Sequence, residues 1–402
     1  MRIFFVAQRV PYPPNRGDKI TTFNEIRHLA ARHEVHVYCL ADGASDLDNV
    51  RGLEPYAATV TAVPVRPLQS RIRAALALVG TKALSVAAFD EPALHAAIKK
   101  GVAEHKPDAI IVYSGNVAQY AEPFADVARV MQFADLDSFK WQQYANRSAP
   151  PMRWVYSSEH RRLLAYERAI AHSFDHSLVC TAIERRDFES LIPGVPVSTV
   201  GNGVDLEYFQ PMGTTKKPAS LVFTGVMDYL PNVDAVLWFC EQMLPLVRAA
   251  VPQATFTICG SRPTPEVQKL AALPGVSVTG LVPDTRTYLD SAEVFVAPLR
   301  MARGIQNKLL EAMAMGLPVV TGNAAWRGTV IAQGDGMFVS DDPAEFAALV
   351  VRLLTNHEFR RSMAARARDN AEHHYRWDTQ MALLDDVLEK AVAGRRRAAQ
   401  EH

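Results

Sequence analysis

The stretch PLRMARGIQNKLLEAMAMGLPVV, residues 298–320, shows most clearly which fold this chain adopts. It follows a short apolar run typical of a buried strand, and it opens with a polar turn that contains Gly304. The periodicity then predicts a helix over 307–315, which Gly316 ends before a β-branched strand over 318–321. A strand, a helix and a second strand in this order indicate one βαβ unit of a parallel sheet.

The same alternation extends along most of the chain and predicts an α/β protein with two doubly wound parallel sheets. At 402 residues the chain is long enough for two domains, and the polar stretch 201–218 is the expected hinge. We predict an N-terminal Rossmann-like domain over 1–203, with a last helix at about 377–402 packing back on it, and a C-terminal domain over 204–376. The expected strands are residues 2–7, 34–39, 60–65, 109–113, 129–134, 176–180 and 197–200, then 220–224, 255–259, 276–279, 294–297 and 318–321; clear helices are expected over 21–32, 152–171, 233–250 and 307–315.

Composition indicates which kinds of partner and which cell compartment to expect. The formal net charge is zero, with 43 basic and 43 acidic residues, so nothing favours nucleic acid. No run of about 18 apolar residues occurs, and the opening apolar run is too short for a signal peptide. The four cysteines lack metal-ligand spacing and are expected to be reduced core thiols. We therefore expect a cytoplasmic protein.

One segment, residues 71–89, joins basic residues to a largely apolar run. One interpretation is a pair of helices packed into the core. The other is a patch that rests on the membrane interface, as a lipid-linked acceptor would require, and that would make the protein peripheral at the inner face of the cytoplasmic membrane. The sequence leaves both open.

Ligands of open parallel sheets bind beyond the carboxyl ends of the strands, which directs attention to the loops there. The first such loop, residues 8–19, contains three prolines, Arg9, Arg16 and Gly17 just before a helix. A helix N-terminus beside a glycine suits a phosphate or a sugar hydroxyl. The alternative is an ordinary rigid loop in which Asp18 caps the helix.

The second loop is Asp135-Leu136-Asp137-Ser138, directly after an expected strand. Either carboxylate could act as a general base on an acceptor hydroxyl. The pair could instead hold a divalent metal, or Asp137 or Ser138 could simply cap the next helix. Lys140 and the aromatic residues after it are of types that contact sugars and phosphates.

The third loop is the opening stretch itself. Lys308 and Glu311 are three residues apart and share one face of the expected helix. A carboxylate there can accept two hydrogen bonds from a ribose diol, while Arg300, Arg303 and Lys308 can hold a diphosphate. The spacing alone leaves open a plain Lys–Glu surface pair beside a solvated loop.

Residues 303–320 resemble the donor motif of the retaining family 4 glycosyltransferases, E-x7-E-A-M-A-x-G-x-P-V. The run from Glu311 to Ala314, Gly316 and residues 318–319 match its second half. In that family the second glutamate typically binds the nucleotide's ribose, which implies this role for Glu311. The first glutamate, which usually contacts the donor sugar, falls on Arg303, so this chain departs from the family there.

Other segments are similar to the same family. The run GNGVD at 201–205 matches its hinge, and FTGVM at 223–227 matches the opening strand of its donor domain. In the family that strand leads to an Arg and a Lys-Gly pair on the diphosphate, whereas here it continues with DYLPNVD. We expect Arg303 and Lys308 to replace those cations. The donor-site candidates are Asn202, Gly225, Arg300, Arg303, Gly304, Asn307, Lys308 and Glu311.

Three blocks resemble the exosortase (PEP-CTERM) system-associated sugar transferases: DLDSFKWQQYA at 135–145, GVMDYLPNVDA at 225–235 and RGIQNKLLEAMAMG at 303–316. The resemblance implies the GT-B fold, in which two Rossmann-like domains face a cleft. It implies transfer from a nucleotide-sugar donor to a glycan or lipid-linked acceptor in exopolysaccharide assembly, with retention and with neither metal nor cofactor.

By the same resemblance Asp135 lies near the expected catalytic residue of the first domain, with Asp137 as the second candidate. Arg9, Arg16, Gly17 and Lys140 then form the acceptor side. Two alternatives remain: a nucleotide-sugar epimerase on the same fold, and a non-catalytic donor-binding scaffold, which the lost glutamate at Arg303 motivates. A dinucleotide oxidoreductase is disfavoured because no GxGxxG follows the first strand of either domain.

Overall fold

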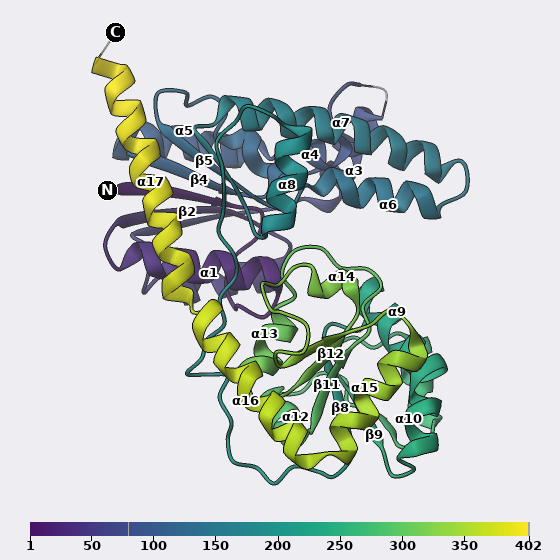
Figure 1. The fold of residues 1–402 in the computed structure, drawn as a ribbon. Coiled ribbons are helices and arrows are strands. Elements are labelled where there is room, and N and C mark those ends of the chain that lie inside the picture. Colours follow the sequence, from purple (N-terminus) through teal and green to yellow (C-terminus); the bar gives the residue numbers. More distant parts are fainter. Residues whose placement is uncertain (79, 401–402) are drawn as a thin grey trace. The chain divides into compact units, whose positions relative to one another are not determined.

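The computed structural model describes residues 1–78 and 80–400, which divide into two compact units. The first unit comprises Met1–Val200 and Met381–His402, and the second comprises Gly201–Gln380. Each is a parallel sheet with helices on both faces (Figure 1), which confirms the predicted fold class. Val79 of the ambiguous segment 71–89, and residues 401–402 of the expected last helix, lie outside the described residues.

The sheet of the first unit has the strand order β3-β2-β1-β4-β5-β6-β7, and all its pairings are parallel. Its strands are β1 (Arg2–Ala7), β2 (Glu34–Ala41), β3 (Thr59–Pro64), β4 (Ala109–Tyr113), β5 (Ala128–Ala134), β6 (His176–Val179) and β7 (Val197–Thr199). The helices are α1 (Gly17–Ala30), α2 (Ala44–Asn49), α3 (Pro67–Ala77), α4 (Leu84–Ala88), α5 (Pro92–His105), α6 (Asp137–Arg147), α7 (Met152–Ser173) and α8 (Ala182–Leu191), with short 3₁₀ turns η1 (Val50–Leu53) and η2 (Gly115–Tyr120). Every residue of β4 is buried, because helices cover both faces of the sheet.

The sheet of the second unit has the order β10-β9-β8-β11-β12-β13. Its strands are β8 (Ser220–Thr224), β9 (Thr255–Cys259), β10 (Val276–Val278), β11 (Val294–Ala297), β12 (Val319–Thr321) and β13 (Met337–Val339). The helices are α9 (Leu230–Trp238), α10 (Leu244–Ala250), α11 (Pro265–Lys269), α12 (Arg286–Ser291), α13 (Asn307–Ala314), α14 (Asn323–Trp326), α15 (Pro343–Thr355) and α16 (His357–His374), with a π-turn η3 (Phe239–Met243) and a 3₁₀ turn η4 (Leu270–Ala272). Sequence patterning missed β13, although the equally short β7, β10 and β12 were expected.

The expected helix over 233–250 is wrong in one respect: it is α9 and α10 joined by the π-turn η3. Pro245 is the cause, because it lacks an N–H and its ring clashes with the preceding turn, so the helical ladder cannot continue through it.

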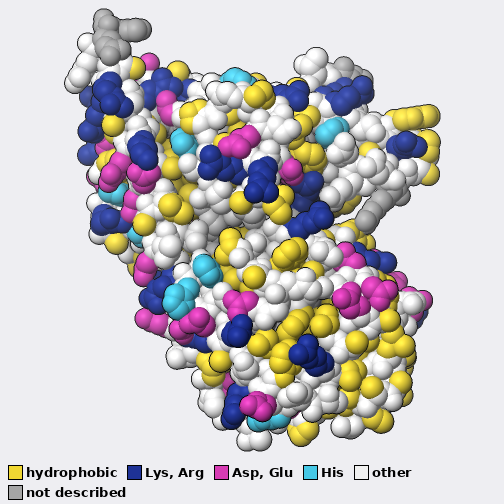
Figure 2. Space-filling model, in the orientation of Figure 1, with side chains coloured by type: hydrophobic (Ala, Val, Ile, Leu, Met, Phe, Trp, Pro, Cys, Tyr) yellow, Lys and Arg dark blue, Asp and Glu magenta, His cyan; other side chains and the backbone are white. Residues whose placement is uncertain are grey.

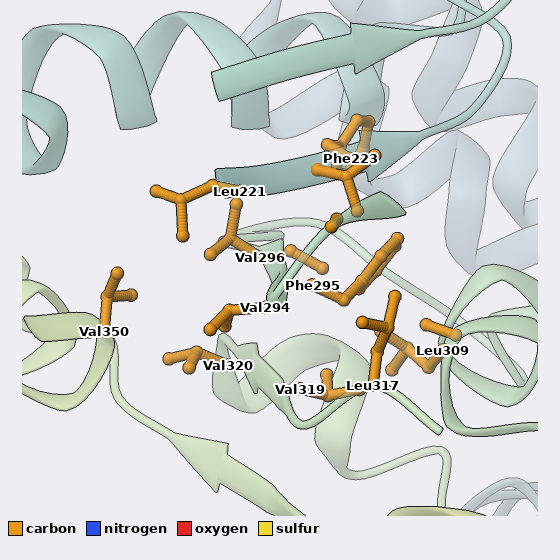
Figure 3. Packing of buried hydrophobic residues seen from close by; sticks show 14 of the residues in the cluster. Leu221, Phe223, Val294, Phe295, Val296, Leu309, Leu317, Val319, Val320 and Val350 are labelled. Atoms are coloured by element: carbon orange, nitrogen blue, oxygen red, sulfur yellow. The ribbon is translucent and has the colours of Figure 1, made fainter. Parts of the chain in front are cut away.

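The core of the second unit fixes which way α13 faces. Figure 3 shows Leu309 of α13 packed with Phe295 and Val319 of the sheet, where burial removes all three from water. Ala312, Met313 and Ala314 are buried on the same side, whereas Lys308 and Glu311 lie on the other face of α13. Packing alone therefore points these two polar side chains away from the core.

The last helix, α17 (Trp377–Gln400), begins in the second unit and belongs to the first unit from Met381 onward. There Asp385 accepts from Nε2 of His28 at 2.9 Å, and Arg395 lies 2.6 Å from Asp175. None of the helices in the described residues is long and apolar enough to cross a bilayer. All four cysteines are free and buried, as predicted.

Candidate active site

The carboxyl ends of β8 and β9 approach each other closely, and two glycines make this possible. The Gly225 N–H donates to the carbonyl of Cys259 at 3.0 Å. A Cβ at Gly260 would lie 1.6 Å from the Gly225 carbonyl oxygen, and a Cβ at Gly225 would lie 2.7 Å from Nδ2 of Asn232. A side chain at Gly260 would collide with backbone, and one at Gly225 would displace the ends of the Asn232 and Lys308 side chains. Glycine backbone therefore forms this edge of the sheet, where ligands of parallel sheets bind.

Lys308 lies in the first turn of α13, with its amine against this backbone. Nζ donates to Oδ1 of Asn232, lies 4.6 Å from the centre of the Phe223 ring, and is 3.1 Å from where a Gly225 Cβ would stand. Burial lowers the pKa of the Lys308 amine to about 7, and the charge of Glu311 opposes this shift. A buried amine that can gain a proton beside open backbone suits an incoming anion.

Glu311 lies three residues further along α13, on the face that Lys308 shares. Burial raises the pKa of its carboxyl to about 7, and Lys308 opposes this shift. When ionised, the carboxylate can accept two hydrogen bonds from a vicinal diol, such as that of a ribose. An amine and a carboxylate on one helix face thus match a diphosphate and a ribose, in that order along α13.

Two asparagines and a glycine complete this part of the second unit. Nδ2 of Asn202 donates to Oδ1 of Asn307 at 2.8 Å, which leaves Nδ2 of Asn307 buried and without a partner among the residues described. That N–H₂ group is a donor that a ligand oxygen could satisfy. Gly304 has a φ of 61°, a left-handed conformation that favours glycine. The structure therefore brings Asn202, Asn307, Lys308 and Gly225 to one edge.

Arg300 and Arg303, the two arginines of residues 298–320, differ in the contacts that the structure gives them. Both Nε and a terminal nitrogen of Arg300 bond the Asp234 carboxylate, and its guanidinium lies 4.7 Å from the centre of the Trp238 ring. This cation already has a carboxylate partner, so the structure does not present it as a free phosphate ligand. The partly buried Arg303 accepts a hydrogen bond from the Gln306 side chain on its carbonyl at 2.8 Å.

In the first unit, the loop after β1 is rich in charge but internally paired. Arg9 contacts Asp18 and Asp42, at 3.2 and 2.8 Å, and Arg16 also pairs with Asp18 at 2.8 Å. The cations therefore have nearby anions, and this argues against a strong phosphate site. Helix α1 begins at Gly17 with Arg16 at the N-cap position, so the alternative that Asp18 is the cap is wrong. Open space surrounds Gly17, and nothing there requires a glycine.

Asp135 and Asp137 follow β5 at the carboxyl edge of the first sheet, as predicted. The side chain of Asp137 accepts a hydrogen bond from Nδ2 of Asn116 at 2.9 Å. Burial raises the pKa of Asp137, while the charges of Lys140 and Arg9 and the bond from Asn116 lower it. Arg9 and Lys140 thus act on the same carboxyl. The capping alternative is wrong, because Leu136 occupies the N-cap position of α6 and no side chain caps the helix.

Sequence patterning missed several residues around these carboxylates. Ser114 and Ala134, at the ends of β4 and β5, have φ values of 85° and 61°, which non-glycine residues rarely adopt. Such strain costs about 1–3 kcal/mol per residue and is concentrated at functional sites. Asn116 and Glu167 are buried beside Asp137, and no local pattern in the sequence places them there.

Within the described residues, one group could offer three metal ligands: Glu34, His36 and His105, whose ligand atoms lie within 4.8 Å of one another. These residues lie at the amino end of β2 and the end of α5, away from Asp135 and Asp137. Arg2 already neutralises the Glu34 carboxylate at 3.1 Å, and the two imidazoles stack face to face with centroids 4.2 Å apart. Stacked rings do not direct their nitrogens at one ion, so the group fits a metal poorly.

Comparison with known proteins finds sequence matches to parts of the chain. Residues 218–356 match the family described as glycosyl transferases group 1. A GDP-mannose-dependent monoacylated alpha-(1-6)-phosphatidylinositol monomannoside mannosyltransferase of Corynebacterium glutamicum is 26% identical over 212 residues, which span 47% of this chain and 55% of that protein. The chain thus spans about half the length of this relative. Both matches are to sugar transferases.

The fold has close structural relatives. Sucrose-phosphate synthase from Thermosynechococcus elongatus has a TM-score of 0.71 and 15% identity, covering 98% of this chain and 100% of that one. HepE of Anabaena, solved in complex with UDP, has a TM-score of 0.67 and 14% identity, covering 97% and 100%. Residues 218–356 thus match the group 1 glycosyl transferases, and the chain has the GT-B fold of these structural neighbours.

Proposed function

We propose that this protein transfers a sugar from a nucleotide-diphosphate sugar to a hydroxyl of a glycan or lipid-linked acceptor. The observation that carries the proposal is that Lys308 and Glu311 share one face of α13, with the Lys308 amine beside Gly225. Their charges and spacing match a diphosphate followed by a ribose. HepE, a neighbour in fold, binds UDP, and the mannosyltransferase relative is named for GDP-mannose, so both kinds of nucleotide belong in the test.

In the proposed reaction the bond between the anomeric carbon and the diphosphate oxygen breaks, and a bond to the acceptor oxygen forms. Negative charge grows on the departing diphosphate, and protonated Lys308, with Arg303 as the second cation, would stabilise it. The acceptor hydroxyl loses its proton, for which Asp135 or Asp137 is the proposed base. We propose that transfer retains the anomeric configuration and needs neither metal nor cofactor.

The acceptor side is proposed for the first unit and for a membrane surface. Helix α3 exposes Leu68, Ile72 and Leu76 to 72%, 50% and 66%, and the four-residue spacing puts all three on one face. Arg71 on the same helix is also exposed. Exposed apolar side chains beside a cation suit an anionic lipid interface, whereas the second half of residues 71–89 follows the core-packed alternative, with Ala83 and Val86 buried against Leu163.

The tip of the α6–α7 hairpin offers a second apolar contact for the same surface. Met152 and Trp154 are 43% and 68% exposed there, and hydrophobic side chains mark this tip in Figure 2. Tryptophan favours the boundary between lipid and water. We therefore propose a peripheral protein at the inner face of the cytoplasmic membrane, acting in exopolysaccharide assembly of the PEP-CTERM-associated type.

The test is a panel of radiolabelled UDP-, GDP- and dTDP-sugars incubated with native lipid extract. We compare the wild type with Glu311→Ala and, as a matched control, with Glu345→Gln, an exposed glutamate of the same unit. We expect one donor to label the lipid fraction, with and without EDTA, and Glu311→Ala to reduce labelling at least about 100-fold. Full labelling by Glu311→Ala would remove the basis of the proposal. Conversion of a donor without acceptor would favour the epimerase.

A further inference from the structure

Helix α7 supplies two buried glutamates whose carboxylates accept hydrogen bonds at the N-termini of other helices. They differ in whether both carboxylate oxygens have a hydrogen-bond partner. Glu159, 1% exposed, accepts hydrogen bonds from the backbone N–H groups of Leu84 and Ser85, at 2.6 and 2.9 Å, and from the Ser85 hydroxyl. Both of its oxygens are satisfied, which is how a buried carboxylate is normally held.

Glu167, two turns further along α7, is equally buried but poorly satisfied. Its Oε1 accepts from the backbone N–H of Ser138 in the first turn of α6, at 3.1 Å. Its Oε2 is buried and finds no partner in the described part of the chain. A carboxylate with one oxygen left without a hydrogen bond is costly to bury, whereas a neutral carboxyl group is less so.

The surroundings also oppose a negative charge on Glu167. Burial raises the pKa of its carboxyl to about 8, the charges of Asp137 and Asp135 add to this shift, and the bonds with Ser138 oppose it. The other charged groups of this region are Arg9 and Lys140, which act on Asp137. His160 of α7 bonds the Ser138 carbonyl at 2.9 Å. Near neutral pH the site therefore holds a neutral Glu167 beside its aspartates.

We propose that Glu167 is a positioning residue for the acceptor-side carboxylates: neutral, it holds the first turn of α6 so that Asp137 faces its hydroxyl substrate, and its ionisation stops transfer. This rests on the proposed function. The geometry favours it because the Ser138 N–H that Glu167 binds lies one residue after Asp137, which Asn116 holds from the other side. Ionised Glu167 would place a second negative charge beside the proposed base and disturb that arrangement.

The experiment is a pH–rate profile of sugar transfer between pH 6 and 9.5 for the wild type, Glu167→Ala, Glu167→Gln and the control Glu159→Gln. We expect wild-type transfer to fall about tenfold per pH unit above pH 8. Glu167→Ala should lose at least about tenfold at pH 7, and Glu167→Gln, a neutral group of the same shape, should restore most of this loss and lack the alkaline decline. Glu159→Gln should lower the melting temperature and keep the decline.

A second readout needs no substrate. The folded-state pKa of Glu167 is raised from 4.5 to about 8, so its contribution to stability is present below pH 4.5 and is lost as the pH rises towards 8. The melting temperature of Glu167→Gln, relative to that of the wild type, should therefore rise between pH 5 and 8. An alkaline decline that persists in Glu167→Gln, or a constant difference in melting temperature, would overturn the inference. Absence of transfer by the wild type at every pH would instead refute the proposed function.

Discussion

Replacing Lys308 with methionine should weaken the binding of a nucleoside diphosphate about 10- to 100-fold. Methionine keeps the length of the side chain and its contact with the Phe223 ring, from whose centre Nζ lies 4.6 Å, but removes the charge. A hydrogen bond to a charged group contributes about 1.5–3 kcal/mol, and about 1.4 kcal/mol is tenfold in affinity. The measurement is isothermal titration calorimetry with UDP and GDP, with Lys269→Met on the exposed face of α11 as control.

The same titration has a pH signature. Because burial lowers the pKa of Lys308 to about 7, the free protein is partly deprotonated at neutral pH, and a bound diphosphate raises this pKa again. Protonation of Lys308 on binding therefore takes up protons, whereas ionisation of Glu311, whose pKa burial raises to about 7, releases them, so the affinity of the wild type should be greatest near pH 7 and the Lys308 part should be absent from Lys308→Met. The nucleotide itself also titrates in this pH range. Subtracting the proton uptake measured with Lys308→Met from that of the wild type removes this contribution. The reasoning fails if Lys308→Met binds within about threefold of the wild type, or if both take up protons equally.

Three more perturbations test separate parts of the structure. Gly225→Ala should raise the nucleotide dissociation constant about tenfold without loss of helical circular dichroism, since the new Cβ would stand 3.1 Å from Nζ of Lys308; unchanged affinity would contradict this. Asp137→Asn should reduce turnover about 100-fold and leave nucleotide affinity unchanged in calorimetry; a loss of affinity instead would place Asp137 on the donor side. Ile72→Glu on α3 should reduce co-sedimentation with anionic vesicles several-fold, with Leu383→Glu on α17 as an exposed control; equal sedimentation would remove α3 from the membrane surface.

The sequence allowed most of the fold to be predicted, because parallel strands buried on both faces leave continuous apolar runs. All twelve expected strands occur, with bounds shifted by a residue or two. The expected helix over 233–250 fails for a physical reason, because Pro245 turns it into α9, a π-turn and α10. That interruption depends on local geometry that periodicity does not register. β13 was missed although β7, β10 and β12, which are equally short, were expected.

Only the part of the site that is formed by residues close together in the sequence could be predicted. Lys308 and Glu311 share a helix face, and their spacing is visible in the sequence. The neighbours of Lys308 are remote in the sequence: Asn232 comes from α9, and Gly225 from the end of β8. Nothing in the sequence showed that Arg300 would pair with Asp234. Contacts between distant segments decide which charges are free, and a single sequence does not contain them.

Calorimetric titration of the wild type and of Glu311→Ala with UDP, GDP, ADP and dTDP tests the central claim most directly. Glu311 is the carboxylate proposed to accept the ribose diol, so its loss removes two charge-assisted hydrogen bonds, worth about 2–4 kcal/mol together and roughly 30- to 1000-fold in affinity. We predict that at least one of these nucleotides binds the wild type with one-to-one stoichiometry and that Glu311→Ala weakens it by that factor. Binding of none of the four, or equal binding by the variant, would contradict a donor site at α13.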